Sequence, residues 1–194
     1  MNLNDHIWNM EIALKEAENA FKQKEVPVGV IIIDPDGKIV TKSYNQKEKL
    51  FDPCGHAEIL ALTEAGKLKK NWRLEGYTLY TTLEPCSMCL GAMVHARIKC
   101  LVFGAYDPKG GAISLGYNLH KDKRLNHRFD VVGGRAKDQA TVMEDEVAVA
   151  ASQRREKPMV GPYTAEESPR SSKSLRSSNS SFLHINWCDY CFNC

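Results

Sequence analysis

Residues 77–89 read Tyr-Thr-Leu-Tyr-Thr-Thr-Leu-Glu-Pro-Cys-Ser-Met-Cys, and this segment combines a strand pattern with a helix start. Residues 77–83 are rich in β-branched and aromatic side chains, which favour a strand. Pro85 is expected at the first position of a helix, because proline is preorganised for that position. Cys86 and Cys89 then lie one helical turn apart and could share one metal ion. The segment therefore predicts a strand that leads directly into a helix with two neighbouring thiols.

Outward from this segment, helix and strand patterns alternate along the chain. The turn sequence Asp34-Pro35-Asp36-Gly37 separates two short runs with strand character, which predicts a hairpin. Such an alternation is typical of a layered α/β domain with a mixed sheet. The expected elements are a helix over 4–23, strands over 28–33 and 38–44, a helix over 56–69, strands over 99–103 and 128–132, and a last helix over 139–155. The apolar stripe of the first expected helix consists of Ile7, Met10, Leu14, Ala17 and Phe21.

The composition excludes several classes of protein. The chain has 194 residues, which suits one domain with an extension. Its net charge of +2 excludes a strongly basic nucleic-acid binder of the histone type, although it leaves room for a local basic surface. No run approaches the ~18 apolar residues of a membrane span, and the first residues lack the pattern of a secretion signal. We therefore expect a cytoplasmic protein without a membrane segment.

The seven cysteines point to metal binding or catalysis, because a reducing cytoplasm disfavours structural disulfides. They form one group in the body of the chain and another at its end. The body holds Cys54, Cys86, Cys89 and Cys100, and the end holds Cys188, Cys191 and Cys194. We expect Cys54 to be a loop thiol and Cys100 to lie in the core.

The last part of the chain differs in composition from the rest. Eight of the fourteen residues in 168–181 are serine, a bias typical of disordered segments. We therefore expect a folded domain over 1–157 and a low-complexity, disordered tail over 158–194. His184 and the three cysteines of the tail have the ligand types of a second metal site. Since no hydrophobic framework surrounds them, chance cysteines in a disordered tail are the favoured interpretation.

The motif His56-Ala57-Glu58 stands at the predicted start of the helix over 56–69. With Cys86 and Cys89, His56 completes a set of three zinc ligands. Catalytic zinc sites use three protein ligands and keep one position open for water, whereas structural sites normally use four. Glu58 is of the right type to carry a proton beside the metal. His56 and Glu58 can converge only if the site lies beyond the N-terminal end of their helix.

Each of the two motifs has a simpler interpretation when it is taken alone. A single Cys-x-x-Cys is often half of a structural zinc site or a pair of buried thiols, and His-x-Glu is common by chance. Together, in this order and each at a predicted helix start, they match the H-x-E and P-C-x-x-C pattern of zinc deaminases. The sequence therefore favours a catalytic zinc site over a structural one.

Several longer motifs carry a family resemblance. They are Glu25-Val26-Pro27-Val28-Gly29, His56-Ala57-Glu58-Ile59, 79–86, 88–93, Asp107-Pro108-Lys109 and Asn126-His127-Arg128. In these motifs the chain resembles the cytidine/deoxycytidylate deaminase superfamily, and more closely the bacterial tRNA-specific adenosine deaminases within it. The resemblance runs from residue 5 to residue 134, in register with few gaps.

The resemblance implies a three-layer cytidine-deaminase-like α/β fold, in which helices flank a five-stranded mixed sheet. It also implies one Zn2+ ion per subunit, a homodimer and, as partner, the anticodon stem-loop of a tRNA. The implied reaction is the hydrolytic deamination of adenosine to inosine at the wobble position of the anticodon. Catalytic zinc suits this reaction because it lowers the pKa of bound water from 15.7 to about 7.

Carried over by position, the resemblance assigns roles to individual residues. The implied zinc ligands are His56, Cys86 and Cys89, and the implied proton shuttle is Glu58. The implied substrate-binding residues are Asn45 beside the target base, Val28 in the wall of the base pocket, and Asp107 and Lys109 in a loop near the RNA backbone.

The residues alone leave two of these roles open. Asn45 is also typical of an ordinary turn after a strand, and Asp107-Pro108 is typical of a turn start. The resemblance fades after Gly134, and the segment 148–152 lacks the aromatic pair that usually closes the family's last helix. A weaker last helix is therefore expected.

Two other functions compete with tRNA deamination. A deaminase of a free base or nucleotide, such as guanine, cytosine or dCMP, would share the same fold. A zinc-containing RNA-binding module without catalysis would need no proton shuttle, so Glu58 argues against it. The region 107–128 resembles the RNA-acting branch of the superfamily, which favours a tRNA over a free base.

Overall fold

Five strands form one mixed sheet in the computed structural model, which describes residues 3–134. The sheet order is β2-β1-β3-β4-β5. β1 pairs antiparallel with β2 and β3, whereas β3, β4 and β5 run parallel, so the mixed sheet and the hairpin are confirmed. The strands are β1 (Gly29–Ile33), β2 (Ile39–Tyr44), β3 (Thr78–Leu83), β4 (Cys100–Ala105) and β5 (Asp130–Gly133).

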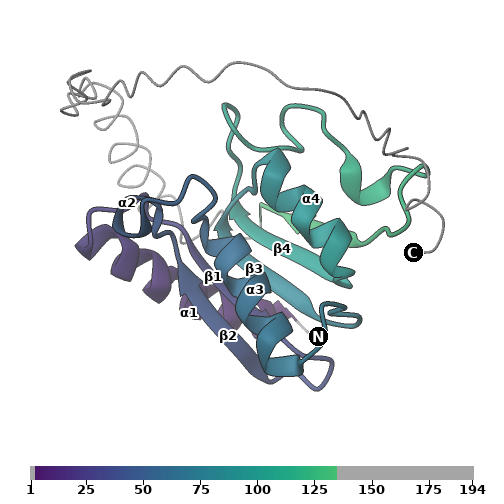
Figure 1. The fold of residues 1–194 in the computed structure, drawn as a ribbon, viewed down its shortest axis with the longest axis horizontal. Coiled ribbons are helices and arrows are strands. Elements are labelled where there is room, and N and C mark those ends of the chain that lie inside the picture. Colours follow the sequence, from purple (N-terminus) through teal and green to yellow (C-terminus); the bar gives the residue numbers. More distant parts are fainter. Residues whose placement is uncertain (1–2, 135–194) are drawn as a thin grey trace, which may run out of the picture. The chain divides into compact units, whose positions relative to one another are not determined.

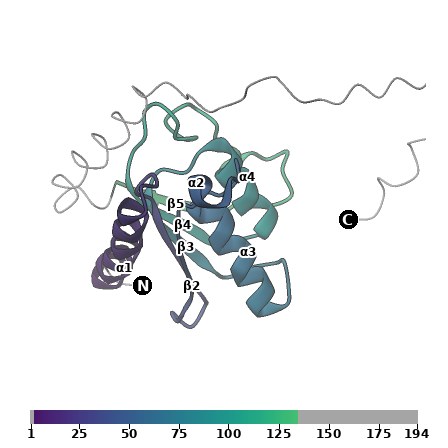
Figure 2. The same cartoon turned by 60° about the vertical axis from the view of Figure 1, so that its left-hand side comes forward.

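Helices cover both faces of this sheet (Figures 1 and 2). The helix α1 (Leu3–Lys22) lies on one face, and α3 (Ala57–Lys69) and α4 (Ser87–Ala96) lie side by side on the other. Successive side chains of a strand point to opposite faces, so β1 feeds two cores. Val30 and Ile32 join the core under α3 and α4, and Ile31 and Ile33 join the core under α1. The predicted three-layer fold is confirmed.

The parallel pair β3 and β4 sets the position of the functional residues. β3 leads into α4, which returns the chain so that β4 can run beside β3 in the same direction. In sheets of this kind, ligands bind beyond the carboxyl ends of the parallel strands. Residues 84–86, which follow β3 directly, therefore lie at the edge where a site is expected.

The predicted core face of α1 is wrong in part. Ile7 is 41% exposed and Phe21 is 61% exposed, while the small residues Ala13 and Ala20 are fully buried. The cause is a close approach between α1 and β1: a Cβ atom added to Gly29 would overlap the backbone at Ala13. Only a helix face of small side chains allows that approach. Apolar periodicity selects large side chains and therefore missed this face.

The predicted helix start at Pro85 is also wrong. α4 begins at Ser87, and Cys86 is its N-cap with an extended backbone. The carbonyl of Pro85 accepts a hydrogen bond from the backbone N–H of Ala112 (2.9 Å). Pro85 thus anchors a distant loop instead of opening the helix.

Two short helices went unpredicted, α2 (Lys47–Leu50) and the 3-10 helix η1 (Leu119–Lys121). Within the described part of the chain, no helix is long and apolar enough to cross a membrane. Several predictions fall outside residues 3–134: the last helix over 139–155, the domain end at 157, the tail over 158–194 and the cysteine cluster Cys188, Cys191 and Cys194.

Candidate metal centre and active site

The three predicted zinc ligands lie together. The Nδ1 atom of His56 is 3.7 Å from the Sγ atom of Cys86 and 3.6 Å from that of Cys89. The two Sγ atoms are 3.7 Å apart. Around a tetrahedral zinc ion, the usual Zn–S and Zn–N bond lengths place such ligand atoms about 3.6–3.8 Å apart. The chemistry and the spacing of this donor set therefore fit zinc.

Two helix starts produce this arrangement. His56 is the N-cap of α3 and Cys86 is the N-cap of α4, and both have extended backbones that turn out of the helix. Cys89 lies in the first turn of α4. The N-terminal ends of both helices are thus directed at one point, and their partial positive charge stabilises thiolates there.

Hydrogen bonding shifts the pKa values of the two thiols in opposite directions. The contact with Cys89 lowers the pKa of Cys86 to about 4. The same contact raises the pKa of Cys89, and burial adds to that increase. The hydrogen bond to Cys86 raises the pKa of His56. One thiolate beside a histidine is the charge pattern that attracts a divalent cation.

Glu58 lies in the first turn of α3 and is only 4% exposed. Burial raises the pKa of its carboxyl group, because a charged carboxylate loses its hydration there. Its electrostatic and hydrogen-bonding partners include His56, Cys86 and Cys89. A protonatable group is therefore held directly at the ligand cluster.

Asn45 and Val28 precede the ligand cluster in sequence, and backbone hydrogen bonds connect their segment to the residue before His56. The backbone N–H of Asn45 donates to the carbonyl of Val28 (3.1 Å). The next residue, Gln46, donates its N–H to the carbonyl of Gly55 (2.9 Å), which directly precedes His56. Val28 is half-buried against the core under α3 and α4. The structure therefore brings both predicted base-pocket residues to the start of α3.

Asp107 and Lys109 lie in the connection that follows β4. The carboxylate of Asp107 accepts the backbone N–H of Lys109 (3.0 Å), and the carbonyl of Asp107 accepts that of Gly111 (2.8 Å). Asp107 thus performs the turn role that its sequence context allowed. Lys109 is exposed.

Glu84 is a buried residue that the sequence reasoning missed. Its carboxylate accepts the backbone N–H groups of Asp107 (3.0 Å) and Ser114 (2.7 Å), and it also accepts the hydroxyl of Ser114. A Cβ atom added to Gly111 would overlap the same carboxylate. Glu84 stands two residues before the ligand Cys86, so it fastens the loop after β4 to the metal-binding segment. The sequence signal that could have identified Glu84 is its position, an acidic residue directly before Pro-Cys.

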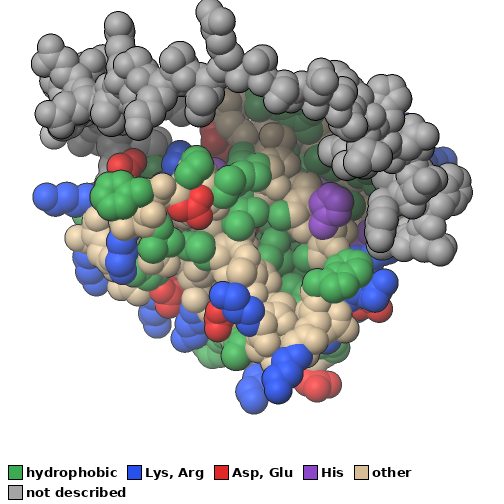
Figure 3. Space-filling model, in the orientation of Figure 1, with side chains coloured by type: hydrophobic (Ala, Val, Ile, Leu, Met, Phe, Trp, Pro, Cys, Tyr) green, Lys and Arg blue, Asp and Glu red, His purple; other side chains and the backbone are tan. Residues whose placement is uncertain are grey.

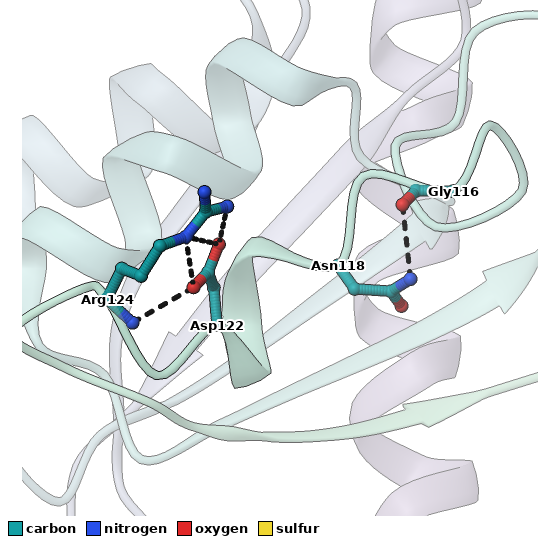
Figure 4. Close-up of polar contacts among 4 residues, drawn as sticks. All are labelled: Gly116, Asn118, Asp122 and Arg124. Atoms are coloured by element: carbon teal, nitrogen blue, oxygen red, sulfur yellow. Dashed lines mark hydrogen bonds and ion pairs between the residues drawn. The ribbon is translucent and has the colours of Figure 1, made fainter.

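The rest of the β4–β5 connection is organised by its own polar contacts (Figure 4). The guanidinium of Arg124 donates two hydrogen bonds from separate nitrogens to the carboxylate of Asp122, of 3.0 and 2.6 Å. This pairing lowers the pKa of Asp122 to about 2. The Nδ2 atom of Asn118 donates to the carbonyl of Gly116 (3.1 Å). In the described part of the chain, Cys54 and Cys100 lie outside the ligand cluster. Cys54 is an exposed loop thiol, as expected, and Cys100 is only half-buried at the margin of the core under α1.

A three-layer fold with a His-Cys-Cys cluster and a buried glutamate at two helix starts defines the class of zinc-dependent deaminases. The model of the family "Cytidine and deoxycytidylate deaminase zinc-binding region" matches residues 3–105. The chain therefore belongs to the cytidine and deoxycytidylate deaminase family, and it is similar in sequence to tRNA-specific adenosine deaminases.

Three relatives illustrate this similarity. The tRNA-specific adenosine deaminase of Bacillus subtilis is 46% identical over 125 residues, covering 64% of this chain and 77% of the relative. That of Rickettsia bellii is 42% identical over 137 residues, covering 70% and 94%. A structure from a study of A-to-I editing by tRNA:A34 deaminases has a TM-score of 0.64 at 38% identity, over 74% of this chain and 99% of that one.

Proposed function

We propose that this protein hydrolytically deaminates adenosine to inosine at the wobble position of a tRNA anticodon. The observation that carries the proposal is the cluster of His56, Cys86 and Cys89 at zinc-ligand spacing, with Glu58 buried against it. The relatives named as tRNA-specific adenosine deaminases support the choice of substrate.

The residues of the cluster divide into metal ligands and a proton carrier. His56, Cys86 and Cys89 hold the zinc ion, which when bound supplies the Lewis acidity that activates a water molecule. Glu58 accepts a proton from the water that attacks C6 of the adenine. Glu58 then delivers the proton to the ring nitrogen and assists the departure of ammonia. Its burial suits this role, because burial raises the pKa of the carboxyl group and so makes the carboxylate a better proton acceptor.

The adenine occupies a pocket beside Val28 and Asn45. A base must leave its stack to reach a buried centre, and this costs less in a single-stranded anticodon loop than in a duplex. Val28 provides an apolar wall and Asn45 a hydrogen bond to the base. The exposed Lys109 and the turn at Asp107 lie on the loop that Glu84 fastens to the centre, where they contact the RNA backbone.

We also propose that the working unit is a homodimer. Figure 3 views the face that carries α3 and α4, and hydrophobic side chains lie across it between those of Lys and Arg. Large apolar side chains are exposed in and just after α2 and α3, and exposed apolar patches mark interaction surfaces. They are Leu50, Phe51, Leu68 and Trp72.

A folded domain over 1–157, followed by a separate tail over 158–194, remains our proposal for the chain, as does a cytoplasmic location.

Substrate choice is tested by incubating the zinc-loaded protein with an anticodon stem-loop that carries adenosine at the wobble position. Parallel reactions contain free adenosine, guanine, cytosine and dCMP, and the Glu58→Gln variant serves as the inactive control. We expect inosine in the stem-loop and no turnover of the free compounds. Deamination of a free base without deamination of the stem-loop would overturn the proposal in favour of a free-base deaminase.

A further inference from the structure

Glu25 is a buried carboxylate outside the metal centre. It is 1% exposed and lies between the end of α1 and the start of β1. One carboxylate oxygen accepts a hydrogen bond from Nδ2 of Asn45 (3.0 Å), and the other accepts one from the backbone N–H of Lys49 (2.8 Å). Across residues 3–134, no Lys or Arg side chain forms an ion pair with it. The carboxylate is therefore balanced by two hydrogen-bond donors, one of which is the side chain expected to contact the base.

The chemistry of these contacts fixes the orientation of the Asn45 amide. A carboxylate has acceptors only, so the amide must turn its NH2 group toward Glu25. The carbonyl oxygen Oδ1 of Asn45 is then directed away from Glu25, and no hydrogen bond from the described residues reaches it. The amide of Asn45 thus leaves its Oδ1 atom available as a hydrogen-bond acceptor.

The second hydrogen bond holds the carboxylate of Glu25 in place. The donor at Lys49 is a backbone N–H, which cannot exchange its place with an acceptor. Lys49 belongs to α2, which follows Asn45 directly in the chain. One carboxylate therefore holds both the Asn45 side chain and the helix that follows it.

We infer that Glu25 is a positioning residue that selects the orientation of the Asn45 amide, so that Oδ1 is presented to a hydrogen-bond donor of the substrate base. The exocyclic amino group of adenine is such a donor. This inference rests on the proposed function, because it takes Asn45 to be a base contact.

The Glu25→Gln variant tests the selection. Glutamine offers one acceptor and one donor, and the fixed N–H of Lys49 takes the acceptor. The NH2 group of the glutamine then faces Asn45, whose amide must turn and present its own NH2 group to the base. We expect kcat/KM for the stem-loop to fall about tenfold or more, with zinc content unchanged. The matched control is Glu48→Gln, which removes the same charge from an exposed site in α2 and should keep full activity.

A second substitution distinguishes positioning from a merely structural role. In the double variant Glu25→Gln/Asn45→Asp, the aspartate accepts a hydrogen bond from the glutamine and presents its other oxygen to the base. The double variant should be several-fold more active than either Glu25→Gln or Asn45→Asp alone, at equal Tm and zinc content. Equal activity of the double and the single variants, or losses that follow Tm or zinc content, would overturn the inference.

A measurement without substrate separates this inference from the proposed function. In the wild type, NMR should show a coupling through the hydrogen bond from Asn45 Nδ2 to the carboxyl carbon of Glu25. That coupling should be lost in Glu25→Gln, and its absence in the wild type would overturn the inference. If the coupling is present but the wild type fails to deaminate the stem-loop, the proposed function fails while the orientation stands.

Discussion

At the scale of single residues, Glu58 and the three ligands depend on where their helices begin. His56 and Cys86 are N-caps, so each lies where the backbone leaves the helical conformation. Glu58 and Cys89 then lie within the first turn of the same helices. A shift of either helix start by one residue would rotate these side chains away from the common point.

Removal of the proton carrier should separate chemistry from metal binding. We expect Glu58→Gln to lower kcat by about 10²- to 10⁴-fold, the range that general acid–base catalysis contributes. The amide keeps the shape of the side chain but cannot carry the proton. Zinc content, measured by atomic absorption, should stay at the wild-type value. A variant that turns over normally would show that another group moves the proton.

At the scale of whole elements, the packing of α1 on β1 depends on a glycine opposite alanines. The overlap predicted for a Cβ at Gly29 involves the backbone of Ala13 and Ala17, which cannot move aside as a side chain can. The same principle applies at Gly111, where the obstacle is the carboxylate of Glu84. At both positions a glycine lets the backbone lie against its neighbour, which is α1 at Gly29 and the carboxylate of Glu84 at Gly111.

The Gly29→Ala variant tests this packing. We expect a loss of about 1–3 kcal/mol in the free energy of unfolding, because the helix must move off the strand. Urea unfolding followed by circular dichroism measures the loss. Gly91→Ala in α4 is the matched control, since a Cβ at that position meets nothing within 4 Å. The control should be unchanged or stabilised by up to about 1 kcal/mol, and an equally stable Gly29→Ala would contradict the packing argument.

The elements show what sequence patterns can and cannot predict. The alternation of elements and the hairpin turn were correct because they follow from local preferences. The α1 face was wrong because the contact that selects alanines lies on β1, outside any local window. Pro85 was misplaced because its carbonyl binds Ala112, which is distant in sequence. The ligand cluster was predictable because its spacing is a chemical requirement of zinc, whereas the roles of Glu25 and Glu84 depend on hydrogen-bond partners that lie 20 to 30 residues away in the chain.

At the scale of the whole molecule, zinc and self-association are the two expected sources of added stability. The ligands come from two helices on the same face of the sheet, and the exposed apolar side chains belong to the segments in and after α2 and α3. Metal loading and assembly therefore involve the same layer of the fold.

Chelation should destabilise the protein. We expect removal of zinc to lower Tm by about 5–10 °C, since saturating ligand contributes a few kcal/mol to the native state. Differential scanning calorimetry with and without chelator measures the shift. Cys86→Ser, which lacks a ligand, should show a much smaller shift, whereas Cys54→Ser, which alters an exposed thiol, should behave like the wild type. A chelator effect of equal size in all three proteins would argue against the assigned ligands.

Substitution of Phe51 should disrupt the proposed dimer. This side chain is 94% exposed, and a charge at its position would be buried unpaired in an apolar interface. We expect Phe51→Glu to be monomeric in sedimentation equilibrium at concentrations where the wild type is dimeric. Phe21→Glu, on the exposed side of α1, should leave the dimer intact. A wild type that is monomeric throughout would refute the assembly.

The His56–Cys86 contact joins positions that are 30 residues apart in the chain and encloses β3 between them. A bound zinc ion thus acts as a reversible cross-link around the central strand of the sheet. Because such a cross-link restricts the unfolded states of the enclosed segment, we expect hydrogen exchange in β3 to be slower when zinc is bound. Exchange rates in β2, which lies outside this loop at the edge of the sheet, should respond far less.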